Sequence, residues 1–63
     1  MIITFTDHEG EFFAFNFNHL RHVSCYKQKI AIEDKNGNFV WYAVPADEVE
    51  KVKKKLEKIA ENA

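Results

Sequence analysis

Three side chains that can bind a transition metal stand close together in the sequence. His19, His22 and Cys25 are spaced three residues apart, and imidazole and thiolate groups are ligands that zinc prefers. On a β-strand, alternation turns His19 and Cys25 to one face and His22 to the other, so only a helical turn would align them. Because we expect extended structure here, we predict two surface histidines and a half-buried thiol, with no metal and no cofactor.

The same region offers little for catalysis. Cys25 beside a histidine could act as a nucleophilic pair, but the sequence supplies no third orienting group and no oxyanion-binding loop. Asp7 and His8 are adjacent, and neighbours on a strand point to opposite faces, so they make a poor acid–base pair. The two glycines, Gly10 and Gly37, cannot form a phosphate-binding loop. We therefore predict that the protein is not an enzyme.

Aromatic side chains near cations are the other group with chemical potential. Single-stranded nucleic acid is often held by bases that stack on exposed rings while lysine or arginine contacts the phosphates. The residues that could build such a face are Phe12, Trp41, Tyr42, Arg21, Lys27 and Lys29. However, 9 Lys and Arg oppose 10 Asp and Glu, giving a formal net charge of -1, whereas such grooves normally carry a basic excess. Core or dimer-interface rings are the favoured interpretation, with nucleic-acid binding as the alternative.

Strand-forming runs must position these side chains. Residues 2–6 combine isoleucine, threonine and phenylalanine, and residues 11–17 are dense in phenylalanine. Between them, Gly10 can take the positive φ of a tight hairpin. Asparagine favours a turn at residues 16–19, after which a third and a fourth strand are predicted up to residue 34.

The clearest turn lies in the second half of the chain. Asn36 and Gly37 stand between two apolar runs, which is a strong hairpin signal, and residues 39–44 follow as a fifth strand. Pro45 ends that strand because it has no N–H to donate, and it suits the start of a helix.

An apolar stripe at helical spacing predicts one helix at the C-terminal end, over residues 46–61. The stripe consists of Val49, Val52, Leu56 and Ile59. The chain is therefore predicted to be a single α+β domain over residues 1–63. Its sheet, an antiparallel β-meander of four to five strands, covers residues 1–44, and the C-terminal α-helix packs on one face of it.

One helix can cover only one face of a small sheet, yet both faces carry large apolar groups. If Phe13, Phe15 and Phe17 meet the helix, then Phe12 and part of the strand over residues 39–44 point away from it. Exposed apolar patches larger than roughly a few hundred Å² usually mark an interface. We therefore expect self-association, either face to face or by pairing of strand edges across a two-fold axis. A strongly curled sheet that wraps around its own core is the alternative.

The composition also bears on location. The chain is 46% hydrophobic, which is enough to fold, but no apolar run approaches the length needed to cross a bilayer. It has one cysteine and no leader-like or lipidation segment. We expect a cytoplasmic protein without a membrane partner.

Several positions along the chain follow the order of a known family pattern. They are Met1, Ile2, Gly10, Phe13, Phe15, Asn16, Leu20, Val23, Ile30, Ile32, Gly37, Val44, Glu48, Val49 and Val52. With an initial Met-Ile, a Gly-x-x-Phe-x-apolar-Asn motif and an acidic helix, the chain resembles the FlbD family of small flagellar-operon proteins, which includes a swarming-motility protein. The resemblance implies a small non-enzymatic accessory protein that contacts other proteins.

The sequence as a whole predicts a protein-interaction or accessory module that binds itself, as a homodimer, or another protein. The candidate residues for its interface or binding face are Phe12, Arg21, Trp41 and Tyr42.

Overall fold

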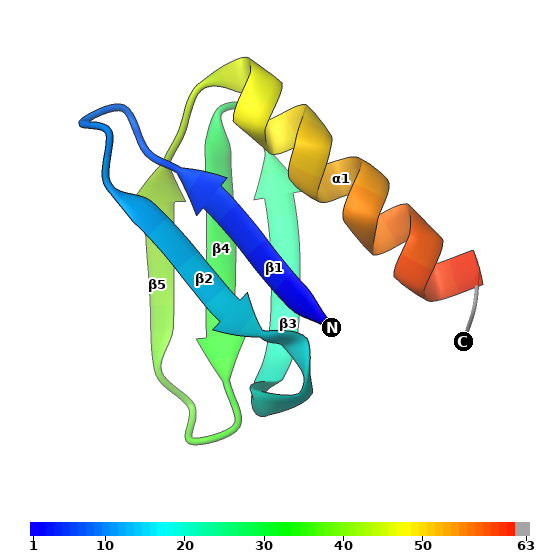
Figure 1. The fold of residues 1–63 in the computed structure, drawn as a ribbon. Coiled ribbons are helices and arrows are strands. Elements are labelled where there is room, and N and C mark those ends of the chain that lie inside the picture. Colours follow the sequence, from blue (N-terminus) through cyan, green and yellow to red (C-terminus); the bar gives the residue numbers. More distant parts are fainter. Residues whose placement is uncertain (62–63) are drawn as a thin grey trace.

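The computed structural model describes residues 1–61 as five antiparallel strands and a C-terminal α-helix (Figure 1). The elements are β1 (Ile2–Thr6), β2 (Phe12–Asn16), a short 3-10 helix (Phe17–His19), β3 (Leu20–Tyr26), β4 (Lys29–Asp34), β5 (Phe39–Ala43) and α1 (Ala46–Glu61). The predicted α+β class, strands and helix are confirmed, while the last two residues of the predicted domain lie outside the described range. No helix within residues 1–61 is long and apolar enough to span a membrane.

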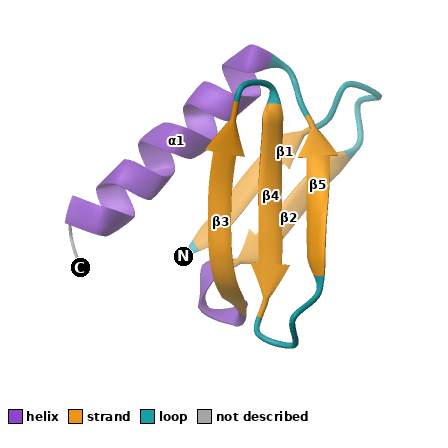
Figure 2. Cartoon of the chain, turned by 180° about the vertical axis from the view of Figure 1, so that it is seen from behind, coloured by secondary structure: helices purple, strands orange, loops and turns teal. Residues whose placement is uncertain are grey.

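The strands form two sheets that lie face to face. β1 and β2 make a two-stranded hairpin, and β3, β4 and β5 make a three-stranded sheet in that order. The hairpin crosses one face of the three-stranded sheet, as the front and back views show (Figures 1 and 2). We call this covered face of the three-stranded sheet its inner face and the opposite one its outer face.

The break between the sheets lies at the predicted turn after β2. The side chain of Asn16 accepts a hydrogen bond from the N–H of Asn18 at 3.0 Å and begins the 3-10 helix. The N–H of Phe17 still donates to the carbonyl of Met1 at 2.9 Å, which is the last rung of the hairpin. The chain then crosses to the second layer, so β3 does not pair with β2 as it would in one continuous meander.

The hydrophobic core fills the space between the layers. Its fully buried members are Ile3, Phe5, Ile30, Ile32, Val44, Val49 and Val52. Phe5 lies at the centre, with its ring centroid 5.4 Å from Phe13, 5.9 Å from Phe15 and 5.4 Å from Tyr42. The three-stranded sheet therefore covers the phenylalanine face that, in one arrangement considered above, would have met the helix.

Helix α1 follows from the residues at its start and from its apolar stripe. The carbonyl of Pro45 accepts hydrogen bonds from the N–H groups of Glu48 and Val49 at 3.0 and 3.1 Å. Val49 and Val52 are buried, while Leu56 and Ile59 pack against the core at its margin, which confirms the predicted stripe. The helix lies beside β1 and also contacts β3.

A carboxylate of the helix accepts a hydrogen bond from the edge of β1 that does not pair with β2. The ladder between β1 and β2 leaves the N–H of Thr6 pointing away from β2, and Oε1 of Glu48 accepts it at 3.0 Å. Oε2 of Glu48 lies 3.1 Å from Nζ of Lys51. The hydrogen bond from Thr6, followed by that from Lys51, holds the pKa of Glu48 below its ordinary value.

Candidate interaction surface

No other element of residues 1–61 covers the outer face of the three-stranded sheet (Figure 2). Ile30 and Ile32 belong to the core, so alternation turns the residues between and beside them outward. By the register of the three strands, the outer face consists of His22, Ser24, Tyr26, Lys29, Ala31, Glu33, Phe39, Trp41 and Ala43.

Three aromatic rings on this face are largely exposed. Phe39 and Trp41 are 48% and 50% exposed and pack edge to face, with ring centroids 5.7 Å apart. Tyr26 is 62% exposed, and Nζ of Lys27 lies 5.4 Å from its ring centroid. Ala31, whose register partners are Ser24 and Trp41, is fully buried at the centre. The middle of the outer face is therefore apolar, and its rings are only half covered.

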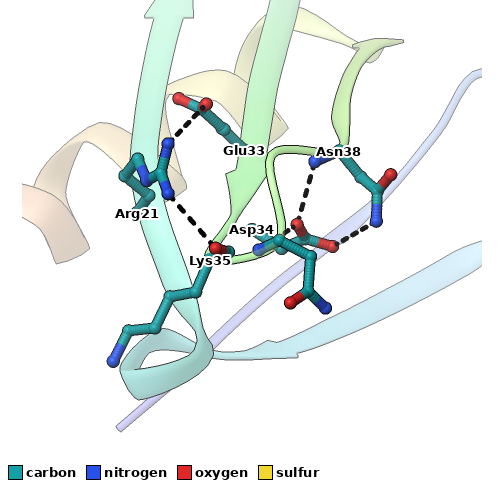
Figure 3. Close-up of polar contacts among 6 residues, drawn as sticks. Arg21, Glu33, Asp34, Lys35 and Asn38 are labelled. Atoms are coloured by element: carbon teal, nitrogen blue, oxygen red, sulfur yellow. Dashed lines mark hydrogen bonds and ion pairs between the residues drawn. The ribbon is translucent and has the colours of Figure 1, made fainter.

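Charged groups occupy the two ends of the outer face. At one end, Nη1 of Arg21 lies 3.5 Å from Oε2 of Glu33, and its Nη2 donates to the carbonyl of Lys35 at 3.2 Å (Figure 3). At the other end lies Lys29, in register with Tyr26 and Ala43. The face thus has an acidic group, paired with Arg21, at one end of β4 and a basic group at the other.

A hydrogen-bonded turn sets the register of β5 (Figure 3). Oδ1 of Asp34 accepts the backbone N–H groups of Asn36 and Asn38, both at 2.9 Å, and Oδ2 accepts the side-chain amide of Asn38 at 3.0 Å. The side-chain hydrogen bond from Asn38, together with the backbone bonds, lowers the pKa of Asp34. Gly37 has a φ of 89°, which a residue with a Cβ rarely adopts. The predicted Asn-Gly hairpin is confirmed.

The outward edge of β5 has no neighbouring strand within residues 1–61. The N–H of Asp34 donates to the carbonyl of Asn38, and that of Val44 donates to Gln28, both at 3.0 Å, so these pairs mark the hydrogen-bonded rungs of the β4–β5 ladder. By alternation, the backbone N–H and C=O groups of Val40 and Tyr42 then point toward β4. The backbone groups that point outward, which we call the β5 edge, belong to Phe39, Trp41 and Ala43.

The hairpin has an open edge of the same kind. The N–H of Asp7 donates to the carbonyl of Glu11 at 3.0 Å and marks the hydrogen-bonded rungs of the β1–β2 ladder. The outward backbone groups of β2, which we call the β2 edge, therefore belong to Phe12, Ala14 and Asn16.

The structure separates the four residues that the sequence suggested. Trp41 lies on the outer face, and the guanidinium of Arg21 reaches the same face through Glu33. Tyr42 points inward, with its ring centroid 4.8 Å from that of Phe13. Phe12 is 66% exposed, but on the far side of the hairpin. Only two of the four thus share a surface.

Two exposed aromatic residues of the outer face, Tyr26 and Phe39, are not among the four candidates from the sequence. Phe39 could have been found by counting from the Asn-Gly turn, because it alternates with Trp41 and must share its face. Tyr26 shares the outer face with Lys29 because a two-residue turn joins β3 to β4, with Lys27 at a φ of 54°. This turn contains no glycine, so the sequence gives little signal for it.

The possible metal ligands do not converge: His22 and Cys25 lie on β3 but face opposite sides, and His19 precedes the strand. His19 belongs to the 3-10 helix, His22 lies on the outer face, and Cys25 is half-buried against the core. Burial raises the pKa of the Cys25 thiol, and the nearby positive charge of Lys53, which lowers it, has a smaller effect. Within residues 1–61, no group of three or more His, Cys, Asp or Glu side chains is arranged to hold a metal ion.

A shallow hollow of about 540 Å³ lies where β3 and β4 join, next to Tyr26. It is lined by His8, Tyr26, Lys27, Gln28, Lys29 and Ala43. The two lysines give this end of the molecule a local positive charge that the formal net charge of -1 does not reveal.

Comparisons with protein-family models, with curated proteins and with solved structures found no match to this chain. The resemblance to the FlbD family stays a prediction from the sequence pattern.

Proposed function

We propose that this protein is a small, non-enzymatic interaction module of the cytoplasm that associates with a second copy of itself. The observation that supports this proposal is the uncovered outer face, where Tyr26, Phe39 and Trp41 remain about half exposed. Phe39 and Trp41 lie on β5, whose outward edge has no neighbouring strand within residues 1–61. Contact with other proteins, as the resemblance to the FlbD family implies, belongs to the same proposal.

The exposed rings supply a driving force for association of limited size. A buried aromatic side chain covers about 150–250 Å², so half of a ring leaves roughly 100 Å² to be buried, worth about 2.5 kcal/mol. Three such rings would contribute roughly 7 kcal/mol, against an association cost of about 4–15 kcal/mol. The gain and the cost are of similar size, so we expect a weak association that becomes visible only at high protein concentration.

The molar mass in solution tests self-association. We expect light scattering to give a mass near that of one chain, 7.4 kDa, in dilute solution and to approach twice that value as the concentration rises. Replacing an outer-face ring, as in Phe39→Ser, should shift the rise to higher concentration. The matched change Phe12→Ser, on the far side of the hairpin, should leave it in place. A mass that stays at one chain up to millimolar concentration would exclude the proposal.

A second function, binding of single-stranded nucleic acid, is favoured by one specific observation. Tyr26 and Trp41 share an open sheet face, and the hollow beside Tyr26 is lined by Lys27 and Lys29. Trp41 is the only tryptophan, so its fluorescence should be quenched by an oligothymidine, and added salt should weaken the binding steeply. Fluorescence that does not change at low salt would remove this function.

A further inference from the structure

We propose that two copies of the chain pair along β5, antiparallel, about a two-fold axis at Trp41. The two three-stranded sheets would then join into one continuous sheet of six strands, three from each copy. This inference rests on the proposed self-association and adds the surface, the orientation and the register.

The sequence of β5 lacks the features that normally prevent strands from pairing. Edge strands of soluble proteins are usually protected by lysine, proline, bulges or a covering element. Residues 38–44 carry no charged side chain and no proline. The opposite edge strand of the same sheet, β3, carries Arg21 at a register irregularity and is contacted by α1. The β5 edge is thus the unprotected edge of this sheet.

Pairing the whole strand with itself selects one register. The outward N–H and C=O groups of Phe39, Trp41 and Ala43 can all be used only if Trp41 lies opposite Trp41 of the second copy. Phe39 then lies opposite Ala43 of the second copy, so that each phenylalanine faces a small side chain. The two tryptophans come together at the centre of the joined outer faces.

The same register places opposite charges on one line across the joined sheet. Glu33 is in register with Phe39, and Lys29 is in register with Ala43. Across the joined strands, Glu33 and Phe39 of one copy are therefore followed by Ala43 and Lys29 of the second copy. A parallel arrangement would instead place Glu33 level with Glu33 and Lys29 level with Lys29. Glu33 and Lys29 of the second copy lie three strand spacings of about 4.8 Å apart, and Glu33 already pairs with Arg21, so their attraction adds little. The antiparallel orientation rests on the pairing of all three outward residues of β5.

The β2 edge offers a poorer match. Antiparallel pairing of β2 with itself would centre on Ala14 and place Phe12 opposite Asn16 of the second copy. No rings would meet, and an apolar side chain would face a polar one. Pairing along β5 buries more apolar surface for the same number of strand residues.

The area involved predicts the strength of the pair. Phe39 and Trp41 are each about half exposed, so their rings supply roughly 200 Å² in each copy. With the strand backbone, the total stays below the roughly 1,200 Å² typical of stable complexes. We therefore expect a dimer that dissociates in the micromolar range or above.

A pair of proline substitutions tests which edge is used. In Ala43→Pro, proline removes an N–H that points outward and that the monomer does not use, and strand edges tolerate proline at such positions. Ala14→Pro is the matched control, because it removes the equivalent N–H from the β2 edge. By light scattering, we expect Ala43→Pro to dimerise about tenfold more weakly than the wild type and Ala14→Pro to dimerise like it.

A charge exchange at residue 41 tests the register and does not depend on a proline being tolerated. Trp41→Lys and Trp41→Glu each place like charges on the two-fold axis, so each protein alone should remain monomeric. An equimolar mixture should form a heterodimer, detectable by native mass spectrometry. Circular dichroism checks that each variant is folded, and rescue by mixing is a result that a misfolded variant cannot give.

The outcomes separate this inference from the proposed function. A wild-type protein that dimerises, together with a mixture that associates no more than either variant alone, would overturn the β5 pairing but leave self-association standing. The same holds if Ala14→Pro, and not Ala43→Pro, weakens the dimer. A wild-type protein that stays monomeric would overturn both, and the oligonucleotide titration would then decide what the outer face binds.

Discussion

Phe5 is the side chain on which the two layers depend most. It is 1% exposed and contacts the rings of Phe13, Phe15 and Tyr42, so it joins both hairpin strands to β5. We expect Phe5→Ala to lower the free energy of unfolding by about 3–5 kcal/mol. A chain of this length has only roughly 3–9 kcal/mol in total, so the variant should be largely unfolded at 37 °C.

Urea denaturation measures this loss against a matched variant. Phe12→Ala removes the same ring from the neighbouring strand, but from a side chain that is 66% exposed. Its effect should stay within about 0.5 kcal/mol. Equal losses for the two variants would contradict the inward orientation of Phe5.

Glu48 predicts a pH dependence of stability. Its pKa is lower in the folded protein than in the unfolded chain, because the N–H of Thr6 and then Lys51 bind the carboxylate. The stabilisation is therefore complete above about pH 4.3, the ordinary pKa of glutamate, and is lost as the pH falls through the lower folded value. We expect Glu48→Gln to melt at a lower temperature than the wild type at pH 7 and to lose less on acidification.

Glu50→Gln is the control for the charge of Glu48. Glu50 also faces a lysine, with its Oε1 3.6 Å from Nζ of Lys53, but its side chain is 63% exposed whereas that of Glu48 is 15% exposed. Solvent screens the exposed pair, so this change should leave the pH profile close to that of the wild type. If both variants flatten the profile equally, the Thr6 contact is not its cause. Asp34, whose pKa is also lowered, is present in the wild type and in both variants, so it contributes equally to the pH dependence of all three.

At the scale of the element, β5 should show alternating hydrogen exchange. The N–H groups of Val40 and Tyr42 bond to β4, while those of Phe39, Trp41 and Ala43 point outward. In dilute solution, NMR should find slow exchange at the first two positions and fast exchange at the other three. Raising the protein concentration should slow the outward three if the strands pair. Fast exchange at Val40 and Tyr42 would contradict the β4–β5 register.

The elements themselves could largely be predicted from the sequence. Asn36-Gly37 located a hairpin because few residues other than glycine accept a positive φ there. Pro45 and the stripe that begins at Val49 located the helix, since both signals depend only on neighbouring residues.

The placement of the elements could not be predicted in the same way. Asn16 indicated a turn, but a turn does not reveal whether the next strand returns to its own sheet or crosses to another. The hydrogen bond from Thr6 to Glu48 joins distant positions and leaves no local signal. The four candidate residues lie apart for a simpler reason: Trp41 and Tyr42 are adjacent, and alternation alone requires them to face opposite ways.

The molecule as a whole has one core shared by both sheets and the helix. Val49 and Val52 of α1 belong to the same buried cluster as Ile3 of the hairpin and Ile30 of the three-stranded sheet. No layer can leave without exposing the others, so unfolding should be a two-state process. The fluorescence of Trp41 and the helical circular dichroism signal should therefore give the same urea midpoint. Separate midpoints would show that α1 or the hairpin unfolds on its own.

The hydrogen bond between Thr6 and Glu48 also indicates an order of events in folding. It joins residues that are 42 positions apart, whereas each hairpin closes over a short loop. The entropy cost of closing a loop rises with its length, so the hairpins should form first and the helix should dock on β1 late. Interactions made after the transition state mainly govern the rate of unfolding. The contact that joins the first strand to the helix is therefore expected to set how long each molecule stays folded, and the hairpins how quickly it folds.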